Sequence, residues 1–299
     1  MKQTETLAKL ACAYSGVVWG LFWIPLRALD GSGVTGAWAT VLFYLVPAVL
    51  FLPIALWRWR ALLAGGWGLQ LTGLVTGTAV VLYADGLVYT EVIRAMLLYY
   101  MTPVWSTLLA RLILKEPITA VRWLAIALGF SGMLVIFGID VGAPLPRNVG
   151  DWMALAGGFC WAIAAVRMRG DTKSSAIEFT SLHFLLGAPV AVLIALLPLA
   201  GAHELPDAAT AAAVLPWLVP TLVIVVVTGS FAAMWGASRL NPGIVGILFM
   251  TEISVGTATA AIWAGEPFGA REIVGVALIT AAGLAESALD LLKWWRGRR

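Results

Sequence analysis

Ten apolar stretches run along the chain, separated by short polar segments. Each is close to the length of a helix that crosses a bilayer, which takes about 20 residues. The stretches lie at 8–26, 38–57, 69–88, 93–114, 121–138, 151–168, 178–199, 213–235, 243–264 and 272–292. The pattern predicts an all-α membrane protein with ten transmembrane helices.

The composition supports this assignment and excludes several other classes of protein. The 299 residues are 61% hydrophobic and only 12% charged, against about 25% charged in an average soluble domain. Such a chain cannot cover its core with polar surface, which excludes a water-soluble enzyme, a nucleic-acid-binding domain and a disordered protein. The two cysteines and two histidines show no metal-ligand spacing, so no metal or cofactor is expected.

Lysine and arginine are distributed unevenly between the two expected sides. With the N-terminus in the cytoplasm, all but four of the 19 basic residues fall on the cytoplasmic side. The four outside are Arg27, Arg94, Arg147 and Arg271. This bias predicts a multi-pass protein of the inner membrane with both termini in the cytoplasm. It also accounts for the net charge of +3 without a nucleic-acid partner.

The two halves of the sequence resemble each other. The matches recur in the same order, 142 residues apart near the start of each half and 150 residues apart further on. They pair 16–20 with 158–162, Gly86 with Gly236, and 109–117 with 259–267. We therefore expect two repeats, 1–142 and 143–299, each with five helices. An odd number of spans would make the second repeat inverted, an architecture typical of alternating-access carriers.

The ends of the repeats carry a resemblance to a known family. The segments concerned are Tyr99–Trp105, Leu114–Pro117, Asn241–Gly243, Met250–Glu252 and Gly265–Pro267. In these segments the chain resembles the drug/metabolite transporter superfamily, in the group with two EamA-type repeats, and looks most like aromatic amino acid exporters of the YddG type. The resemblance implies export of small metabolites through a cavity lined by the first, third, fourth, sixth, eighth and ninth helices. One departure is Ile253, where many relatives have proline after the glutamate.

Glu252 is the first candidate for substrate binding, because it lies near the centre of the ninth stretch. A carboxylate at that depth is costly unless it is paired or hydrated. It would contact a substrate amine or bind a coupling proton; the alternative is a protonated structural group. Trp19 and Trp161, which are repeat mates near the middle of their spans, would stack on a planar substrate or pack between helices.

The third and fourth stretches supply further candidates. Tyr99 and Pro103 share one helical face, and Pro103 would kink the helix and free a backbone carbonyl. Tyr83 is a parallel candidate on the third stretch. Asp85 and Arg94 lie beside the short loop between these two stretches, so we expect an ion pair that is structural or part of a gate.

These features together predict a secondary exporter of small metabolites, aromatic or other neutral amino acids first, that works by alternating access. The partners are a small amino-acid-like molecule and the lipid bilayer, and oligomerisation is not required. Another amphipathic metabolite or a drug stays open as the substrate. An intramembrane enzyme is disfavoured because HExxH, GxSxG and clustered acidic ligands are all missing from the sequence. A channel would more often need several chains around one pore.

Overall fold

The computed structural model describes residues 2–90, 92–137, 146–197, 205–263 and 268–296, without the side chains of residues 2, 27, 30, 92–94, 97, 137, 260 and 286–296. Every secondary-structure element in these ranges is helical. The first half contains α1 (Lys2–Trp19), α2 (Trp23–Gly31), α3 (Ala37–Trp57), α4 (Trp59–Ala64), α5 (Gly66–Tyr89), α6 (Val92–Tyr99), α7 (Thr102–Ile113) and α8 (Ala120–Phe137). The second half contains α9 (Val149–Gly170), α10 (Ala176–Ala195), α11 (Ala208–Leu222), η2 (Val223–Val227), α12 (Thr228–Ala237), α13 (Pro242–Phe249), α14 (Thr251–Trp263) and α15 (Ala270–Arg296).

Seven helical stretches among the described residues are long and apolar enough to cross a membrane. They correspond to the first, second, third, sixth, seventh, eighth and ninth expected spans. An eighth apolar helix, Ala120–Ile136, is shorter and corresponds to the fifth. The all-helical membrane class is therefore confirmed, and the full count of ten crossings stays a prediction.

Several helices that were expected to be continuous are interrupted. The fourth expected span divides into α6 and α7, and the ninth divides into α13 and α14. Pro103 lies in the first turn of α7, where its missing N–H leaves no bond unmade and its ring disfavours helical backbone just before it. The eighth expected span contains the π-helical segment η2, a distortion that often occurs at functional sites.

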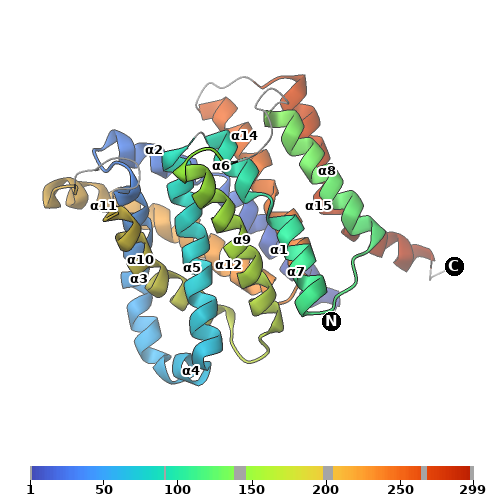
Figure 1. Ribbon diagram of the computed structural model, residues 1–299, viewed down its shortest axis with the longest axis horizontal. Coiled ribbons are helices and arrows are strands. Elements are labelled where there is room, and N and C mark those ends of the chain that lie inside the picture. Colours follow the sequence, from blue (N-terminus) through green and yellow to red (C-terminus); the bar gives the residue numbers. More distant parts are fainter. Residues whose placement is uncertain (1, 91, 138–145, 198–204, 264–267, 297–299) are drawn as a thin grey trace.

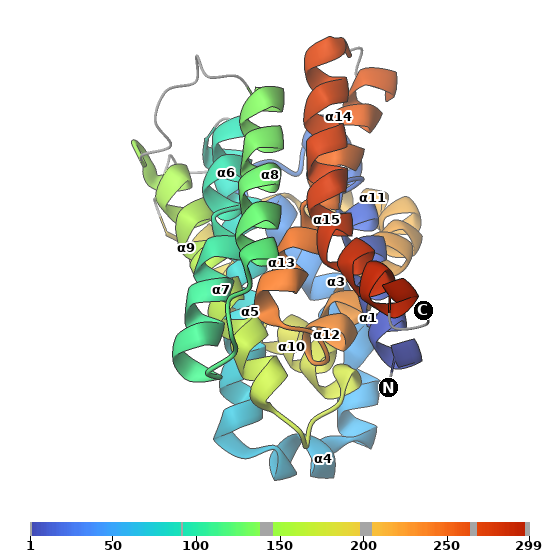
Figure 2. The ribbon, with the colours of Figure 1, turned by 90° about the vertical axis from the view of Figure 1, so that its right-hand side faces the viewer.

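Figures 1 and 2 show how the helices are arranged. The helices α8 and α15 pack against each other at one edge, and α11 lies at the opposite edge in Figure 1. Between these edges, α5 packs against both α9 and α10. The centre of the bundle thus joins helices from both halves of the sequence.

Close glycine contacts between the halves occur in matched pairs. A Cβ atom at Gly86 of α5 would lie 3.1 Å from the Cβ of Ala154 of α9. The repeat mate of Gly86 is Gly236 of α12, and a Cβ there would overlap the sulfur of Cys12 in α1. Cys12 and Ala154 are 142 residues apart, the spacing that relates the starts of the two repeats. The contact of α5 with α9 is therefore repeated by α12 with α1.

A second matched pair lies at the helix interruptions. A Cβ at Gly16 of α1 would lie 3.2 Å from the carbonyl oxygen of Phe249, where α13 ends. A Cβ at Gly158 of α9 would overlap the carbonyl oxygen of Tyr99, where α6 ends. Only glycine allows the two backbones to come this close. Each broken helix is thus held against the first helix of the other repeat.

Polar contacts also tie the halves together at the lower end of the bundle in Figure 1. Arg58, which follows α3, donates from Nε to Oε1 of Glu178 in α10 at 2.7 Å. The other carboxylate oxygen of Glu178 accepts from the backbone N–H of Ser175 at 2.6 Å and forms a capping box. Both oxygens of this buried carboxylate therefore accept hydrogen bonds.

Glu116, after α7, forms the second part of these contacts. It lies 3.4 Å from Nε of Arg169 at the end of α9, and it accepts a hydrogen bond from the side chain of Asn241. Arg167 donates to the carbonyl oxygen of Gly68 at 2.8 Å. We refer to Arg58, Glu116, Arg167, Arg169, Glu178 and Asn241 together as the polar clasp. It joins the first repeat to the second at one end of the molecule.

Candidate functional site

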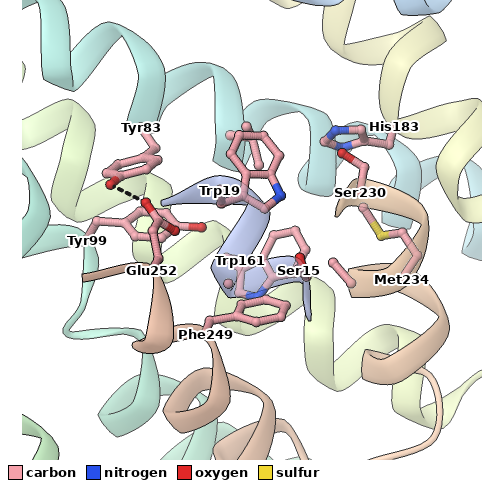
Figure 3. Close-up of a pocket in the computed structure, with 13 residues that line it drawn as sticks. Ser15, Trp19, Tyr83, Tyr99, Trp161, His183, Ser230, Met234, Phe249 and Glu252 are labelled. Atoms are coloured by element: carbon pink, nitrogen blue, oxygen red, sulfur yellow. Dashed lines mark hydrogen bonds between the residues drawn. The ribbon is translucent and has the colours of Figure 1, made fainter. Parts of the chain in front are cut away.

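A cavity lies at the centre of the bundle, next to the interruption between α13 and α14 (Figure 3). Residues from α1, α5, α6, α9, α10, α12, α13 and α14 line it. They are Ser15, Gly16, Trp19, Val80, Tyr83, Tyr99, Trp161, His183, Ser230, Ala233, Met234, Phe249 and Glu252. The cavity thus receives Trp19, Tyr83, Tyr99, Trp161 and Glu252, five of the six candidates for substrate binding.

Pro103, the sixth candidate, does not line this cavity. It packs against α13, where a Cβ at Gly246 would lie 3.0 Å from the Cα of Pro103. The proline starts α7 instead of kinking a continuous helix, because α6 has already ended at Tyr99. Its place in the structure therefore indicates helix packing.

Glu252 is held by two phenol groups. Tyr83 donates to Oε1 at 2.9 Å, and Tyr100 donates to Oε2 at 2.5 Å. The side chain is in the first turn of α14, where the positive end of the helix dipole favours a carboxylate. Among the described residues, no lysine or arginine forms an ion pair with it. Among the described residues, only neutral donors bind the carboxylate, so a cationic ligand would supply the opposite charge that it lacks.

Tyr100 was not among the candidates, although it binds Glu252 directly. In a continuous helix, neighbouring residues point about 100° apart, so Tyr99 and Tyr100 would lie on different faces. The interruption after Tyr99 lets both approach the cavity region, with their rings 5.5 Å apart and nearly perpendicular. Tyr99 also stacks on Tyr83 at 4.0 Å. The residues Thr102-Pro103 were the signal for this break.

The two tryptophans form much of the aromatic wall. Trp161 lies 5.5 Å from the ring of Phe249, and its buried Nε1–H has no hydrogen-bond partner among the described residues. A buried indole N–H normally finds an acceptor. Trp19 closely approaches Gly229, where a Cβ would lie 3.1 Å from its Nε1. The wall therefore offers an apolar surface and one donor that is free to bind a ligand.

Two polar residues on the other side of the cavity were also missed. The hydroxyl of Ser230 is buried and has no hydrogen-bond partner among the described residues. The buried ring of His183 lies beside the backbone of Thr76 and contacts Tyr44 through Nε2. Figure 3 shows the side chains of Ser230 and His183 close together, on the side of the cavity away from Glu252. The position of His183 within an apolar stretch was a usable signal, because an ionisable group at that depth is rarely without a role.

Asp85 lies away from this cavity and is fully buried. Neither of its carboxylate oxygens has a hydrogen-bond partner among the described residues. The side chain of Arg94 lies outside the described part of the chain, so the expected ion pair stays a prediction. The described residues contain no cluster of three or more potential metal ligands.

Comparison with known proteins now decides the family. The model of the EamA-like transporter family matches residues 6–138 and 148–285, which is most of the chain. The chain belongs to the EamA-like transporter family. The two matched segments confirm two repeats in this EamA transporter, and they confirm the resemblance to the drug/metabolite transporter superfamily. The more specific resemblance to YddG-type exporters stays a prediction.

Individual relatives of this EamA transporter add little about its substrate. It is 29% identical over 119 residues to the uncharacterized transporter YyaM of Bacillus subtilis (strain 168), covering 38% of the chain and 39% of the relative. It is 30% identical over 118 residues to an uncharacterized transporter in the sor 3′ region of Acidianus ambivalens, covering 40% and 46%. The chain therefore matches less than half the length of each relative.

A crystal structure described only as that of a protein shares the fold. It has a TM-score of 0.71 and 17% sequence identity, and the match covers 94% of this chain and 98% of the other. At this identity the likeness concerns the fold alone. The chain is thus a multi-pass helical membrane protein of the EamA-like transporter family.

Proposed function

We propose that this EamA transporter exports small amphipathic molecules that carry an amino group, and that aromatic and other neutral amino acids are the first candidates. The main support is the position of Glu252, a buried carboxylate that lines the central cavity without a cationic partner among the described residues. An ammonium group placed there would gain a charge-assisted hydrogen bond. Aromatic rings on the walls favour a substrate with a planar apolar part.

The free polar atoms opposite Glu252 define the rest of the substrate. The indole N–H of Trp161 requires an acceptor, and Ser230 and His183 offer further hydrogen bonds. A carboxylate or carbonyl group on the substrate would satisfy them. An amino acid would then bind with its amino group at Glu252 and its carboxyl group toward Trp161 and Ser230.

One observation favours a second substrate class, amphipathic amines without a carboxylate. The residues lining the cavity include one carboxylate and neither lysine nor arginine. A substrate carboxylate would therefore depend on neutral donors and on His183. Phenylalanine and phenethylamine differ only in this group, so comparing the two separates the classes.

We further propose ten spans in two inverted repeats, operating by alternating access in the cell's inner membrane. The exchange of contacts between the halves supports this arrangement: α5 meets α9 as α12 meets α1, with the same repeat positions in contact. A two-fold relation between the halves produces such an exchange. Because each repeat would have five spans, the axis would lie in the membrane plane.

Counterflow in proteoliposomes tests the function. Vesicles preloaded with unlabelled phenylalanine, phenethylamine, another neutral amino acid or buffer alone receive the labelled compound outside. Saturable, substrate-specific exchange in the loaded vesicles is the expected result. Absence of exchange for the whole panel, or ionic conductance instead of exchange, would reject the proposed function.

A further inference from the structure

We infer that Asp85 is a proton-binding site that couples the proposed transport to a proton gradient. Asp85 does not line the substrate cavity, and its side chain is fully buried between helices. Among the described residues, neither of its oxygens makes a hydrogen bond of ordinary distance and angle, and the hydroxyl of Thr40 is a polar group beside it. An ionised carboxylate in such a place is costly because it has left water, and binding one proton removes that cost.

The contrast with the other buried carboxylates points to Asp85. Glu252 accepts hydrogen bonds from two tyrosines, and Glu178 is paired with Arg58. Asp151, at the start of α9, accepts from Thr90 and from the backbone N–H of Arg147. Each of these three has donors that compensate the charge. Among these four buried carboxylates in the described part of the chain, Asp85 alone has neither an ion pair nor a hydrogen bond of ordinary geometry, and its neighbouring donor is the neutral hydroxyl of Thr40.

Tyr44 lies near Asp85 and contacts His183, a residue that lines the substrate cavity. Its hydroxyl donates to the carbonyl oxygen of Gly77 at 3.2 Å and lies 3.3 Å from Nε2 of His183, which lines the cavity. Thr40 is one turn before Tyr44 on α3, and its buried hydroxyl lies beside Asp85. Tyr44 therefore adjoins both the cavity and the surroundings of Asp85.

The groups around Asp85 fit a proton better than a metal ion. The charge of Asp85 reaches Tyr44 of α3 and Tyr89 of α5 itself. The elements packed around it also carry, among other titratable or charged groups, Arg94 of α6, Asp151 of α9 and His183 of α10. A sodium or calcium ion would need several oxygen ligands converging on one point. The structure places the side-chain oxygen of Thr40 beside Asp85, and the described residues contain no cluster of three or more potential metal ligands. One oxygen of the carboxylate is enough to bind a proton.

The proposed exchange is balanced. With the cavity open to the outside, the Asp85 carboxylate takes up one proton from that side and becomes the neutral acid. With the cavity open to the cytoplasm, it returns the proton there and becomes a carboxylate again. One substrate molecule leaves the cell for each proton that enters, and no covalent bond other than O–H forms or breaks.

Infrared difference spectroscopy tests proton binding without any substrate. The purified full chain in liposomes is titrated with acid, and the carbonyl band of a protonated buried carboxyl group is followed. We expect a band that Asp85→Asn removes and that Asp151→Asn, a matched buried carboxylate with its own partners, retains. An unchanged band in Asp85→Asn, or no such band in the wild type, would overturn the inference.

Coupling is tested with labelled phenylalanine in vesicles whose membrane potential is clamped at zero. A gradient of one pH unit, acid inside, sustains about tenfold accumulation when one proton exchanges for one substrate. We expect this accumulation in the wild type, and only equilibration in Asp85→Asn, while its counterflow at equal pH persists. A structural role of Asp85 would instead reduce both activities together.

Two further variants keep this test decisive if Asp85→Asn folds poorly. Tyr44→Phe retains the ring and removes the hydroxyl, so we expect a lower ratio of gradient-driven uptake to counterflow. Glu252→Gln, in the substrate cavity, should weaken both activities and leave their ratio unchanged. A ratio that falls in Glu252→Gln but not in Tyr44→Phe, or accumulation driven equally by sodium alone, would reject Asp85 as the coupling site. If wild type shows no counterflow with any probe, the transport proposal fails, whereas the infrared result still decides proton binding.

Discussion

At the residue scale, Glu252 brings three separate segments of the chain to one point. Its carboxylate connects α14 to Tyr83 of α5 and to Tyr100, which lies between α6 and α7. The hydroxyl of Tyr100 also donates to the carbonyl oxygen of Phe249 at 3.1 Å. A change at this carboxylate therefore affects substrate binding and also the contact between two interrupted helices.

Replacing Glu252 by glutamine tests its role as the contact for the amino group. Gln keeps the shape but loses the charge, and its NH₂ group faces a tyrosine donor. A hydrogen bond to a charged group contributes about 1.5–3 kcal/mol, so the half-saturating concentration of an amine substrate should rise about tenfold or more. Counterflow kinetics measure this rise. An unchanged half-saturating concentration would remove Glu252 from the binding site.

Replacing Trp161 by phenylalanine isolates its unpaired N–H. The aromatic wall remains, whereas the donor is lost. A neutral hydrogen bond contributes about 0.5–1.5 kcal/mol, so affinity for phenylalanine should fall by about threefold to tenfold. Phenethylamine has no carboxylate to accept that bond, so its affinity should stay constant. Equal losses for both compounds would mean that Trp161 acts through packing.

At the element scale, glycine seams determine how closely α5 approaches its neighbours. A Cβ at Gly77 would lie 2.7 Å from the Cα of Gly187 and 2.7 Å from the carbonyl oxygen of His183, both in α10. Backbone atoms cannot move aside as a flexible side chain can. Gly68, on the same helix, has no atom within 4 Å of such a Cβ.

This pair of glycines provides a matched stability test. Gly77→Ala should lower the free energy of unfolding by about 1–3 kcal/mol through overpacking. Gly68→Ala should leave it unchanged or raise it by up to about 1 kcal/mol, because alanine is the better helix former. Thermal unfolding in detergent, followed by tryptophan fluorescence, compares the two. A larger loss in Gly68→Ala than in Gly77→Ala would contradict the described helix contact.

The apolar pattern of the sequence was sufficient to predict the helical membrane class and the place of most spans. It could not predict the interruptions, because hydropathy does not register a break such as that after Tyr99. The break in turn brings Tyr100 to Glu252. Ser230 and His183 were not predicted as site residues for a different reason. The sequence shows that each is a polar residue in an apolar stretch, but only the packing of the helices shows which residues lie beside it. Repeat matching singled out Trp19 and Trp161 together, and both line the central cavity.

At the scale of the whole molecule, the matched contacts of α5 with α9 and α12 with α1 favour two halves of opposite orientation. If each half has five spans, the chain crosses the membrane ten times. Because this number is even, both chain ends lie on the same side of the membrane. Single cysteines at Gln3 and Arg298, in a variant without Cys12 and Cys160, should react with an impermeant maleimide from the same side. Reaction from opposite sides would contradict the ten-span arrangement.

The polar clasp has a consequence for the medium in which the transporter works. One pair in the clasp is partly exposed, with side-chain exposures of 39% for Arg169 and 24% for Glu116. Dissolved ions weaken attraction between exposed charges over about 8–10 Å at physiological concentrations. If the clasp must separate in each transport cycle, added salt should accelerate exchange in the wild type and have less effect in Glu116→Gln. The ionic strength on that side of the membrane would then determine the lifetimes of the outward-open and inward-open conformations.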